Sequence, residues 1–264
     1  MSSPAISTTT IGSDGAELDC FVVPWDSRIF GFAVAQISRM DLGDPGIRSA
    51  GLFASFDAWC SERGVRLVSC RLDHSQLRES MELEAHGFRF VEVVYEPRLD
   101  ALEAVAPPRH AIDVTKATQG DLPAIEGVAY SAFTTGRFLL DHRLPPDLNN
   151  RRYATWVRSA FEASHQTVLK AELDGALVGF FIVEHHPDKR VYWHLTAIAS
   201  GWQGKGIGLS LWQTMLLRHA AEGATSIETT ISGHNLAAIN LYARLGFSFS
   251  SAQMTFHRLR DRSG

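Results

Sequence analysis

A glycine-rich turn in the second half of the chain carries the strongest chemical signal in the sequence. The stretch AIASGWQGKGIGLSLW joins a strand pattern to a helix pattern, and Gln203, Gly206 and Gly208 give it the spacing Gln-x-x-Gly-x-Gly. Glycine lets a backbone approach a ligand closely and adopt a positive φ. The free N–H groups at the start of the following helix, together with its dipole, favour an anion. Lys205 adds positive charge, so the turn predicts a pyrophosphate site.

Other glycine-rich turns have a similar composition. A Walker loop needs Gly-Lys-Ser/Thr, whereas Ile207 follows Gly206 in this chain. A Rossmann loop has an acidic residue about 20 residues further on, and Glu222 and Glu228 bracket that distance. Spacing therefore leaves the Rossmann alternative open. A merely tight turn also stays open, because this signal is weak on its own.

A second chemical pattern lies in HNLAAINLYARLGF. Tyr242 follows Asn235 by seven positions, nearly two turns of helix, so the two side chains share a face. A phenol there can donate a proton, and an amide can hold a polar ligand. The alternative is that Tyr242 packs its ring and forms a local hydrogen bond.

Together these patterns resemble those of the GCN5-related N-acetyltransferase (GNAT) superfamily. The resemblance covers about residues 111–260 and rests on the turn Gln203–Gly208, on Asn235-x-x-Ala238-x-x-x-Tyr242 and on Leu245-Gly246-Phe247. It implies an enzyme that transfers acetyl from acetyl-coenzyme A to a primary amine. In this family the glycine turn binds the pyrophosphate, and the preceding strand parts from its neighbour and holds the pantetheine.

The resemblance also implies roles for single residues. An N–H near Ile198 would polarise the thioester carbonyl as an oxyanion donor, and Tyr242 would protonate the departing thiolate. Ser200 departs from the family pattern, in which proline is common. The implied cofactor contacts are Ala197, Ile198, Gln203, Gly204, Lys205, Gly206, Ile207, Gly208, Asn235, Asn240 and Tyr242.

The chain repeats part of itself. Shifted by 159 residues, the range 64–90 aligns with 223–249 without a gap, and the order of predicted elements agrees. This agreement favours a duplication over chance. The identical pairs are Gly64 and Gly223, Leu77 and Leu236, Gly87 and Gly246, Phe88 and Phe247, and Phe90 and Phe249.

The first copy lacks the chemical residues of the second. Ile47 and Ser49 take the places of the last two turn glycines, and Leu83 takes that of Tyr242. A Cβ at those turn positions would obstruct a ligand. We therefore expect an α/β (α+β) fold of tandem GNAT-like mixed sheets flanked by helices, with a truncated, degenerate N-terminal copy. The expected domains are 1–100, a linker at 101–110 and a catalytic domain at 111–264.

Two further stretches point to the acceptor. PWDSRIFGF (24–32) and the range 136–161 resemble segments of dTDP-fucosamine acetyltransferases and related sugar N-acyltransferases. That resemblance implies acetylation of the 4-amino group of a nucleotide-linked 4-amino-4,6-dideoxysugar, and it implies a homodimer. Gly136 departs from the serine expected at its position.

The implied substrate contacts are Arg137, Phe138 and Trp25. A guanidinium suits a diphosphate, and an indole can stack on a sugar or a base. For Arg137 the alternative is an ion pair with Asp141 at i and i+4. For Trp25 the alternative is a buried aromatic anchor.

The general base stays open at this point. His194, Glu184 and His185 lie on neighbouring predicted strands and could accept the amine proton directly or through water, but each also fits an ordinary position on a strand. Two rival functions stay open as well. One is an acetyltransferase for a peptide, protein or antibiotic amine, and the other is an acetyl-coenzyme A-binding module without turnover.

Composition narrows the class of protein. The 264 residues are 45% hydrophobic, enough for a core, and a net charge of −4 offers no basic excess for nucleic acid. The three cysteines show no CxxC spacing, and the start lacks a secretory pattern. No apolar run suits a membrane span, and the eleven histidines show no metal-ligand spacing. We expect a cytoplasmic enzyme without a metal.

Periodicity and turn residues place the elements. Strands are expected at 18–23, 32–40, 65–72, 88–99 and 190–200, and in a hairpin around Asp174-Gly175. Helices are expected at 47–64, 75–87, 144–163 and 204–223.

Overall fold

The computed structural model describes residues 7–44 and 49–260. Its contacts divide the chain into two compact units, each described here by itself. Unit 1 comprises the residues up to Val94 together with those from Ala252, and unit 2 comprises Tyr95–Ser251. Both are α/β structures with a mixed sheet covered by helices, as the sequence predicted at this level. Ile47 lies outside the described residues.

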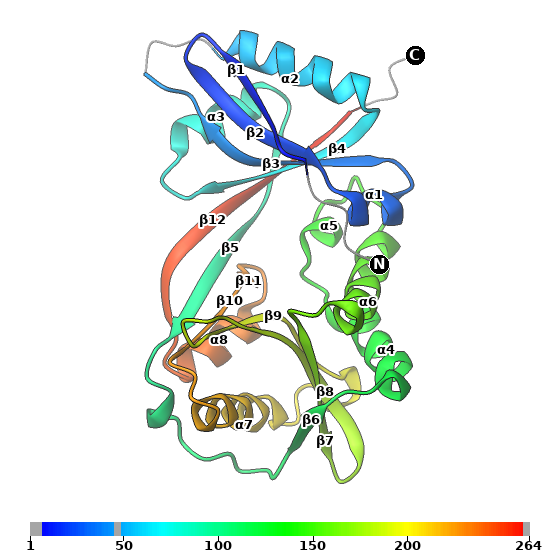
Figure 1. The fold of residues 1–264 in the computed structure, drawn as a ribbon, viewed down its shortest axis with the longest axis vertical. Coiled ribbons are helices and arrows are strands. Elements are labelled where there is room, and N and C mark those ends of the chain that lie inside the picture. The colour runs from blue at the N-terminus through cyan, green and yellow to red at the C-terminus, as the bar shows by residue number, and fades with distance from the viewer. Residues whose placement is uncertain (1–6, 45–48, 261–264) are drawn as a thin grey trace. The chain divides into compact units, whose positions relative to one another are not determined.

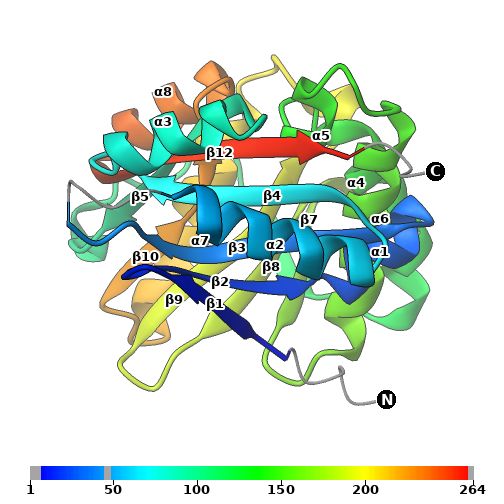
Figure 2. The ribbon, with the colours of Figure 1, turned by 90° about the horizontal axis from the view of Figure 1, so that it is seen from above.

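Unit 1 contains a sheet with α2 packed on one face (Figure 2). The strand order is β1 (Thr9–Ser13), β2 (Ala16–Val22), β3 (Ala33–Asp41), β4 (Val65–Asp73) and the end of β12 (Ser248–Leu259). The pair β3–β4 is parallel, and the other pairs are antiparallel. The helices are α1 (Pro24–Phe30), α2 (Ala50–Glu62) and α3 (Leu77–Ala85). Strand β1 and helix α1 were not predicted from the sequence.

Unit 2 contains a sheet with helices on both faces. The strand order is the end of β5 (Arg89–Leu99), β10 (Ser226–Thr229), β9 (Arg190–Ile198), β8 (Ala176–His185), β7 (Thr167–Leu173) and β6 (Asp113–Lys116), and the short β11 (Ile231–Ser232) pairs with β5. Only the pair β9–β10 is parallel among these described pairs. Helix α7 (Ile207–Ala221) covers one face, and α4 (Leu122–Ala132) and α6 (Asp147–Glu162) cover the other (Figure 1). The remaining helices are α5 (Arg137–Leu140), α8 (Leu236–Arg244) and three short 3-10 helices at Leu102–Ala104, Gln119–Asp121 and Ser200–Trp202.

A bulge in β9 places the side chains of Trp193 and Leu195 in two different hydrophobic cores. The β8–β9 register shifts so that Val183 faces Trp193 and Ile182 faces Leu195, which leaves His194 without a partner in that register. Trp193 packs in the core beside α7, whereas Leu195 packs in the core beside α4 and α6. His194 is therefore the extra residue of the bulge.

Element bounds repeat at the spacing found in the sequence. A shift of 159 residues carries the bounds of α3 (Leu77–Ala85) onto those of α8 (Leu236–Arg244), and the start of β5 onto the start of β12. Gly87 and Gly246, which end the two helices, have φ values of 83° and 87°. Gly-Phe-x-Phe therefore marks the same helix-to-strand turn twice.

The last strand of each repeat is divided between the units: the part of β5 from Tyr95 belongs to unit 2, and the part of β12 from Ala252 belongs to unit 1. On β5, Arg98 and Leu99 pair with β10 of unit 2, while β12 pairs with β4 of unit 1 over residues 253–259. The described residues from 252 therefore fall in unit 1, whereas the sequence placed them in the catalytic domain 111–264. The proposed linker 101–110 also packs, because Leu102 is buried and the His110 N–H donates to Ser210 Oγ on α7 at 3.3 Å.

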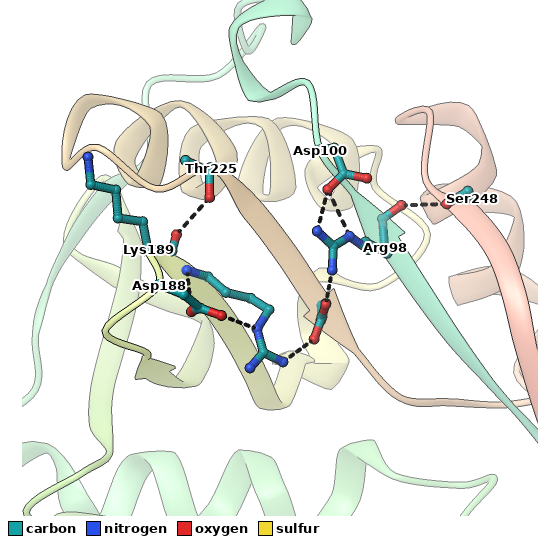
Figure 3. A network of polar contacts seen from close by, with 8 residues as sticks. Arg98, Asp100, Asp188, Lys189, Thr225 and Ser248 are labelled. Atoms are coloured by element: carbon teal, nitrogen blue, oxygen red, sulfur yellow. Dashed lines mark hydrogen bonds and ion pairs between the residues drawn. The ribbon is translucent and has the colours of Figure 1, made fainter.

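Ion pairs join β5, β10 and β9 within unit 2 (Figure 3). Arg98 Nη1 lies 2.5 Å from Glu228 Oε1, and Arg190 Nη1 lies 2.8 Å from Glu228 Oε2. Asp100 and Asp188 accept from the Nε groups of the same two arginines. Glu228 thus bridges the strand contributed by the first repeat to the sheet of the second.

In the described part of the chain, no helix combines the length and apolar content that a membrane span needs. The three cysteines are free and buried in unit 1.

Candidate active site

The glycine turn runs from the end of β9 into the start of α7. Gly204 and Gly206 have φ values of 74° and 76°, a region that residues with a Cβ rarely adopt. A Cβ on Gly208 would lie 3.0 Å from Ile198 Cδ1. Gly206 is the N-cap of α7 and provides no side-chain cap. The first N–H groups of α7 are therefore not satisfied by a capping side chain, as an anion site requires.

Gln203 and Lys205 have different roles in the turn. Gln203 Nε2 donates to the carbonyl oxygen of Ile198 at 3.1 Å, which ties the turn back to β9. Lys205 Nζ lies 5.1 Å from the centre of the Trp202 ring. Residues 203–206 are exposed, so a phosphate group could reach their backbone and the lysine charge.

One edge of β9 is open beside this turn. Strand β10 pairs with β9 from Ser226↔Arg190 to Thr229↔Trp193, and within the described residues it offers no partner to positions 194–198. On the other edge, β8 stays paired as far as Gly179↔Ile198. The backbone of Ala197 and Ile198 thus lies on a strand whose neighbour has ended, next to the glycine turn.

Tyr242 lies in the core of unit 2, with an exposed fraction of 2%. Its ring centroid is 4.7 Å from that of Phe247 and 6.2 Å from that of Trp212. Burial raises the pKa of Tyr242 to about 12, although the polar groups of Trp212, Thr196 and Thr229 oppose the shift. The phenol therefore keeps its proton at physiological pH.

The two asparagines predicted as cofactor contacts lie differently. Asn235 is the N-cap of α8, and its Oδ1 accepts from the Ala238 N–H at 3.1 Å. The Asn235 oxygen thus has a structural partner. Asn240 is exposed on α8.

His194 and Glu184 form a pair at the bulge of β9. His194 Nε2 lies 2.7 Å from Glu184 Oε2, and the rings of Tyr192 and Trp156 flank the imidazole at 4.8 and 6.5 Å between centroids. Burial lowers the pKa of His194, and Glu184 opposes this shift. The imidazole is therefore neutral at pH 7. His185 lies apart from this pair, near Glu222.

The predicted substrate residues are partly buried and occur in both units. Phe138 is buried in unit 2, with the guanidinium carbons of Arg137 and Arg152 at 4.7 and 5.4 Å from its ring centre. Asp141 accepts two hydrogen bonds of 2.8 Å from Arg143. Trp25 belongs to unit 1 and is 45% exposed, so the alternative of a buried anchor is wrong.

Packing explains why glycine precedes Arg137. A Cβ at Gly136 would collide with Asn149 Oδ1 and would lie 2.8 Å from Tyr153 OH. Asn149 is itself buried, and its Nδ2 donates to the Phe133 carbonyl oxygen at 2.9 Å. A serine at position 136 would therefore have to displace a buried, hydrogen-bonded side chain.

The fold and the turn agree with the comparison to known families. Residues 135–247 match the model of the acetyltransferase (GNAT) family. Members of the family use acetyl-coenzyme A as the acetyl donor.

The names of individual relatives refer to different functions. The chain is 25% identical over 138 residues to the spore coat polysaccharide biosynthesis protein SpsD of Bacillus subtilis, covering 52% of this chain and 47% of the relative. It is 27% identical over 255 residues to a mycothiol acetyltransferase of Kytococcus sedentarius, covering 87% and 78%. A tandem GNAT protein from the clavulanic acid biosynthesis pathway has a similar fold, with a TM-score of 0.60, 16% identity and coverage of 100% and 86%. The chain thus spans about half the length of SpsD.

Proposed function

We propose that this protein is an N-acetyltransferase that transfers acetyl from acetyl-coenzyme A to a primary amine. The observation that carries the proposal is the glycine turn at the start of α7, directly beside the open edge of β9. An anion site and a free strand edge, placed end to end, suit a molecule that has a pyrophosphate followed by an amide-containing arm. The match of residues 135–247 to the GNAT family model supports the same assignment.

In the proposed reaction, the neutral amine attacks the thioester carbonyl directly. A C–N bond forms, the C–S bond breaks, and the electron pair leaves with sulfur. Backbone N–H groups near Ile198 would stabilise the oxyanion. Tyr242 would protonate the thiolate as general acid. The turn Gln203–Gly208 would bind the pyrophosphate, with Asn235 and Asn240 as further cofactor contacts.

We propose His194, oriented by Glu184, as the group that accepts the amine proton. Three observations support this choice over His185. The imidazole is neutral at pH 7, a carboxylate holds one of its nitrogens, and it lies where β10 ends and the edge of β9 opens. A neutral imidazole in this position has the chemistry of a general base.

We also propose that the two repeats are GNAT-like copies and that the first has lost its cofactor site. The coincidence of element bounds at a spacing of 159 residues supports the duplication. In place of Tyr242, the first copy has Leu83, which is fully buried. An apolar side chain there fills the core without offering a proton.

For the acceptor, we propose a nucleotide-linked 4-amino-4,6-dideoxysugar, dTDP-linked in the first instance. About half of this chain is similar to SpsD, a protein named for spore coat polysaccharide biosynthesis. This similarity supports a sugar as the acceptor. Arg137, Phe138 and Trp25 are the proposed contacts, with the guanidinium on the diphosphate. A homodimer and a cytoplasmic location belong to the same proposal.

The test is release of free coenzyme A from acetyl-coenzyme A in the presence of a panel of amines. The panel contains dTDP- and UDP-linked 4-amino-4,6-dideoxysugars, 3-amino sugars, an aminoglycoside and a basic peptide. We expect turnover with a nucleotide 4-amino sugar. Turnover with only the peptide or the aminoglycoside would keep the acetyltransferase and discard the sugar. Binding of acetyl-coenzyme A without product from any amine would favour the non-catalytic module.

A further inference from the structure

We propose that His185, His219 and Glu222 form a binding site for a zinc-class divalent metal ion. All three belong to unit 2. They come from the end of β8 and from the last turn and C-cap of α7, so they are distant in sequence and adjacent in space. The sequence predicted no metal because spacing along the chain cannot reveal such a cluster.

The ligand atoms are close to the separation that an ion needs. Glu222 Oε2 lies 3.2 Å from His219 Nδ1 and 3.7 Å from His185 Nε2. Each residue offers one ligand atom, and the three atoms lie within 4.8 Å of one another. Zinc binds nitrogen and carboxylate oxygen at roughly 2.0–2.2 Å, which separates ligands of a tetrahedral site by about 3.4 Å. His185 is exposed and can close the remaining gap by a rotation of its side chain.

The donor set has the composition of a known kind of zinc site. Two imidazoles and one carboxylate leave a fourth position for water. A metal binds the unprotonated nitrogen of an imidazole, and His219 offers Nδ1 toward Glu222 from a fully buried ring. Imidazole nitrogen also prefers zinc and its transition-metal neighbours to magnesium or calcium.

Arg218 holds the carboxylate in the orientation that a ligand requires. Its Nε donates to Glu222 Oε1 at 2.9 Å, and its Nη1 donates to the Val114 carbonyl oxygen at 2.6 Å. The other carboxylate oxygen, Oε2, is left facing both histidines. Hydrogen bonds from outside the metal sphere commonly fix ligands in this way.

The contact between His219 and Glu222 at the end of one helix does not explain why His185 joins them. His219 and Glu222 are at i and i+3, so their contact is expected on any helix end. His185 comes from a different element, and its ring centroid lies 5.4 Å from that of His219. The cluster lies at the opposite end of α7 from the glycine turn, about 22 Å away for a helix of this length. The ion would therefore fasten α7 to β8 and take no part in acetyl transfer.

The experiment titrates the tag-free, metal-stripped full-length protein with ZnCl₂ in a calorimeter and with Co²⁺ in an absorption spectrometer. We expect one ion per chain and a cobalt spectrum of a four-coordinate centre. Either His185→Ala or Glu222→Gln should weaken binding by about 100-fold, because each removes a direct ligand. Zinc should also raise the Tm of the wild type but not that of His185→Ala.

The matched control is His74→Ala. His74 is also exposed, and its Nδ1 lies 3.5 Å from Asp73 Oδ1. Among the described residues, this pair has no third side chain close enough to form a metal site. It should bind zinc as the wild type does. Two results would overturn the proposal: no saturable binding by the wild type at millimolar zinc, or wild-type affinity in both His185→Ala and Glu222→Gln.

Discussion

Tyr242 is buried, and burial favours its protonated form. The phenol would give up its proton only to a strong base. A pKa of about 12 means that the phenol is protonated throughout the physiological range. In the proposed reaction, the phenol would donate this proton to the departing thiolate as the C–S bond breaks. The same burial makes Tyr242 part of the core.

Replacement of Tyr242 by phenylalanine separates these two roles. We expect the rate of acetyl transfer to fall by about 10²- to 10⁴-fold, since the acid is lost and the ring is kept. The dissociation constant of acetyl-coenzyme A, measured by calorimetry, should change little. Turnover equal to that of the wild type would remove the acid role. In the wild type, the rate should also show no loss from tyrosinate formation up to about pH 10, because the neutral form persists below the pKa.

The His194–Glu184 pair predicts a shift in the acidic limb of the pH–rate profile. Burial holds the pKa of His194 below its usual value of 6.5, so the active neutral form should persist at pH 6.5 and disappear only at lower pH. Glu184 favours the protonated form, so Glu184→Gln should lower this pKa and move the limb further toward acid. Coulombic interactions with His165 and His186 also lower the pKa of His194, in the same direction as burial.

His194→Asn is the complementary variant. It should lower kcat/KM by about 10²-fold and abolish the acidic limb that belongs to this group. His165→Ala, which removes an exposed neighbour, is the control and should keep the rate. A profile of His194→Asn with the wild-type limb would assign the base elsewhere.

At the scale of elements, the turn between β9 and α7 offers a matched pair of glycines. Gly206 has a positive φ and Gly201 does not, and a Cβ at either position would meet open space. Gly206→Val forces an L-residue into a left-handed conformation, at a cost of about 1–3 kcal/mol. Acetyl-coenzyme A binding should weaken by tenfold or more, while Gly201→Val should bind nearly as the wild type. Equal affinities would place the phosphate site away from this turn.

Gly136 and Gly127 are a second pair of glycines for comparison. Here the quantity measured is the free energy of unfolding. Gly136→Ala should lower the free energy of unfolding by about 1–3 kcal/mol, because its Cβ meets the buried Asn149. Gly127→Ala should raise it by up to about 1 kcal/mol, because this glycine lies inside α4 with open space around it. Chemical denaturation measures both. A Gly136→Ala protein as stable as the wild type would mean that Asn149 moves aside at no cost.

Local patterns in the sequence predicted most of the helices and strands, but they did not predict how strands distant in the sequence pair. The hairpin at Asp174-Gly175 is confirmed, with φ values of 52° and 76°. Asp14-Gly15 carries the same signal, with φ values of 51° and 85°, and it would have revealed the missed β1–β2 hairpin. The glycine turn could be predicted because its residues are contiguous. The pairing of His194 with Glu184 depends on strand register across a bulge, which sequence spacing does not encode.

At the scale of the whole molecule, the predicted catalytic domain 111–264 lacks a strand that its sheet uses. Leu99 and Arg98 of β5 pair with β10, and Arg98 also contributes to the ion pairs with Glu228 (Figure 3). We expect a fragment of residues 111–264 to be markedly less stable than the full chain, with weak protection of the β10 amides in hydrogen exchange. A fragment as stable and as protected as the full chain would show that β5 is dispensable.

The pairing of β5 with β10 and of β12 with β4 limits which deletions the gene can tolerate. A deletion that removed the first copy would also take β5 from the sheet that carries the glycine turn, and a stop codon ahead of β12 would uncover β4. Under the proposed duplication, point substitutions such as Leu83 for a tyrosine could accumulate in the first copy, whereas excision of that copy would damage the second. If the first copy has lost its cofactor site, as proposed, it is still protected from deletion, because selection for the second copy is enough to preserve both.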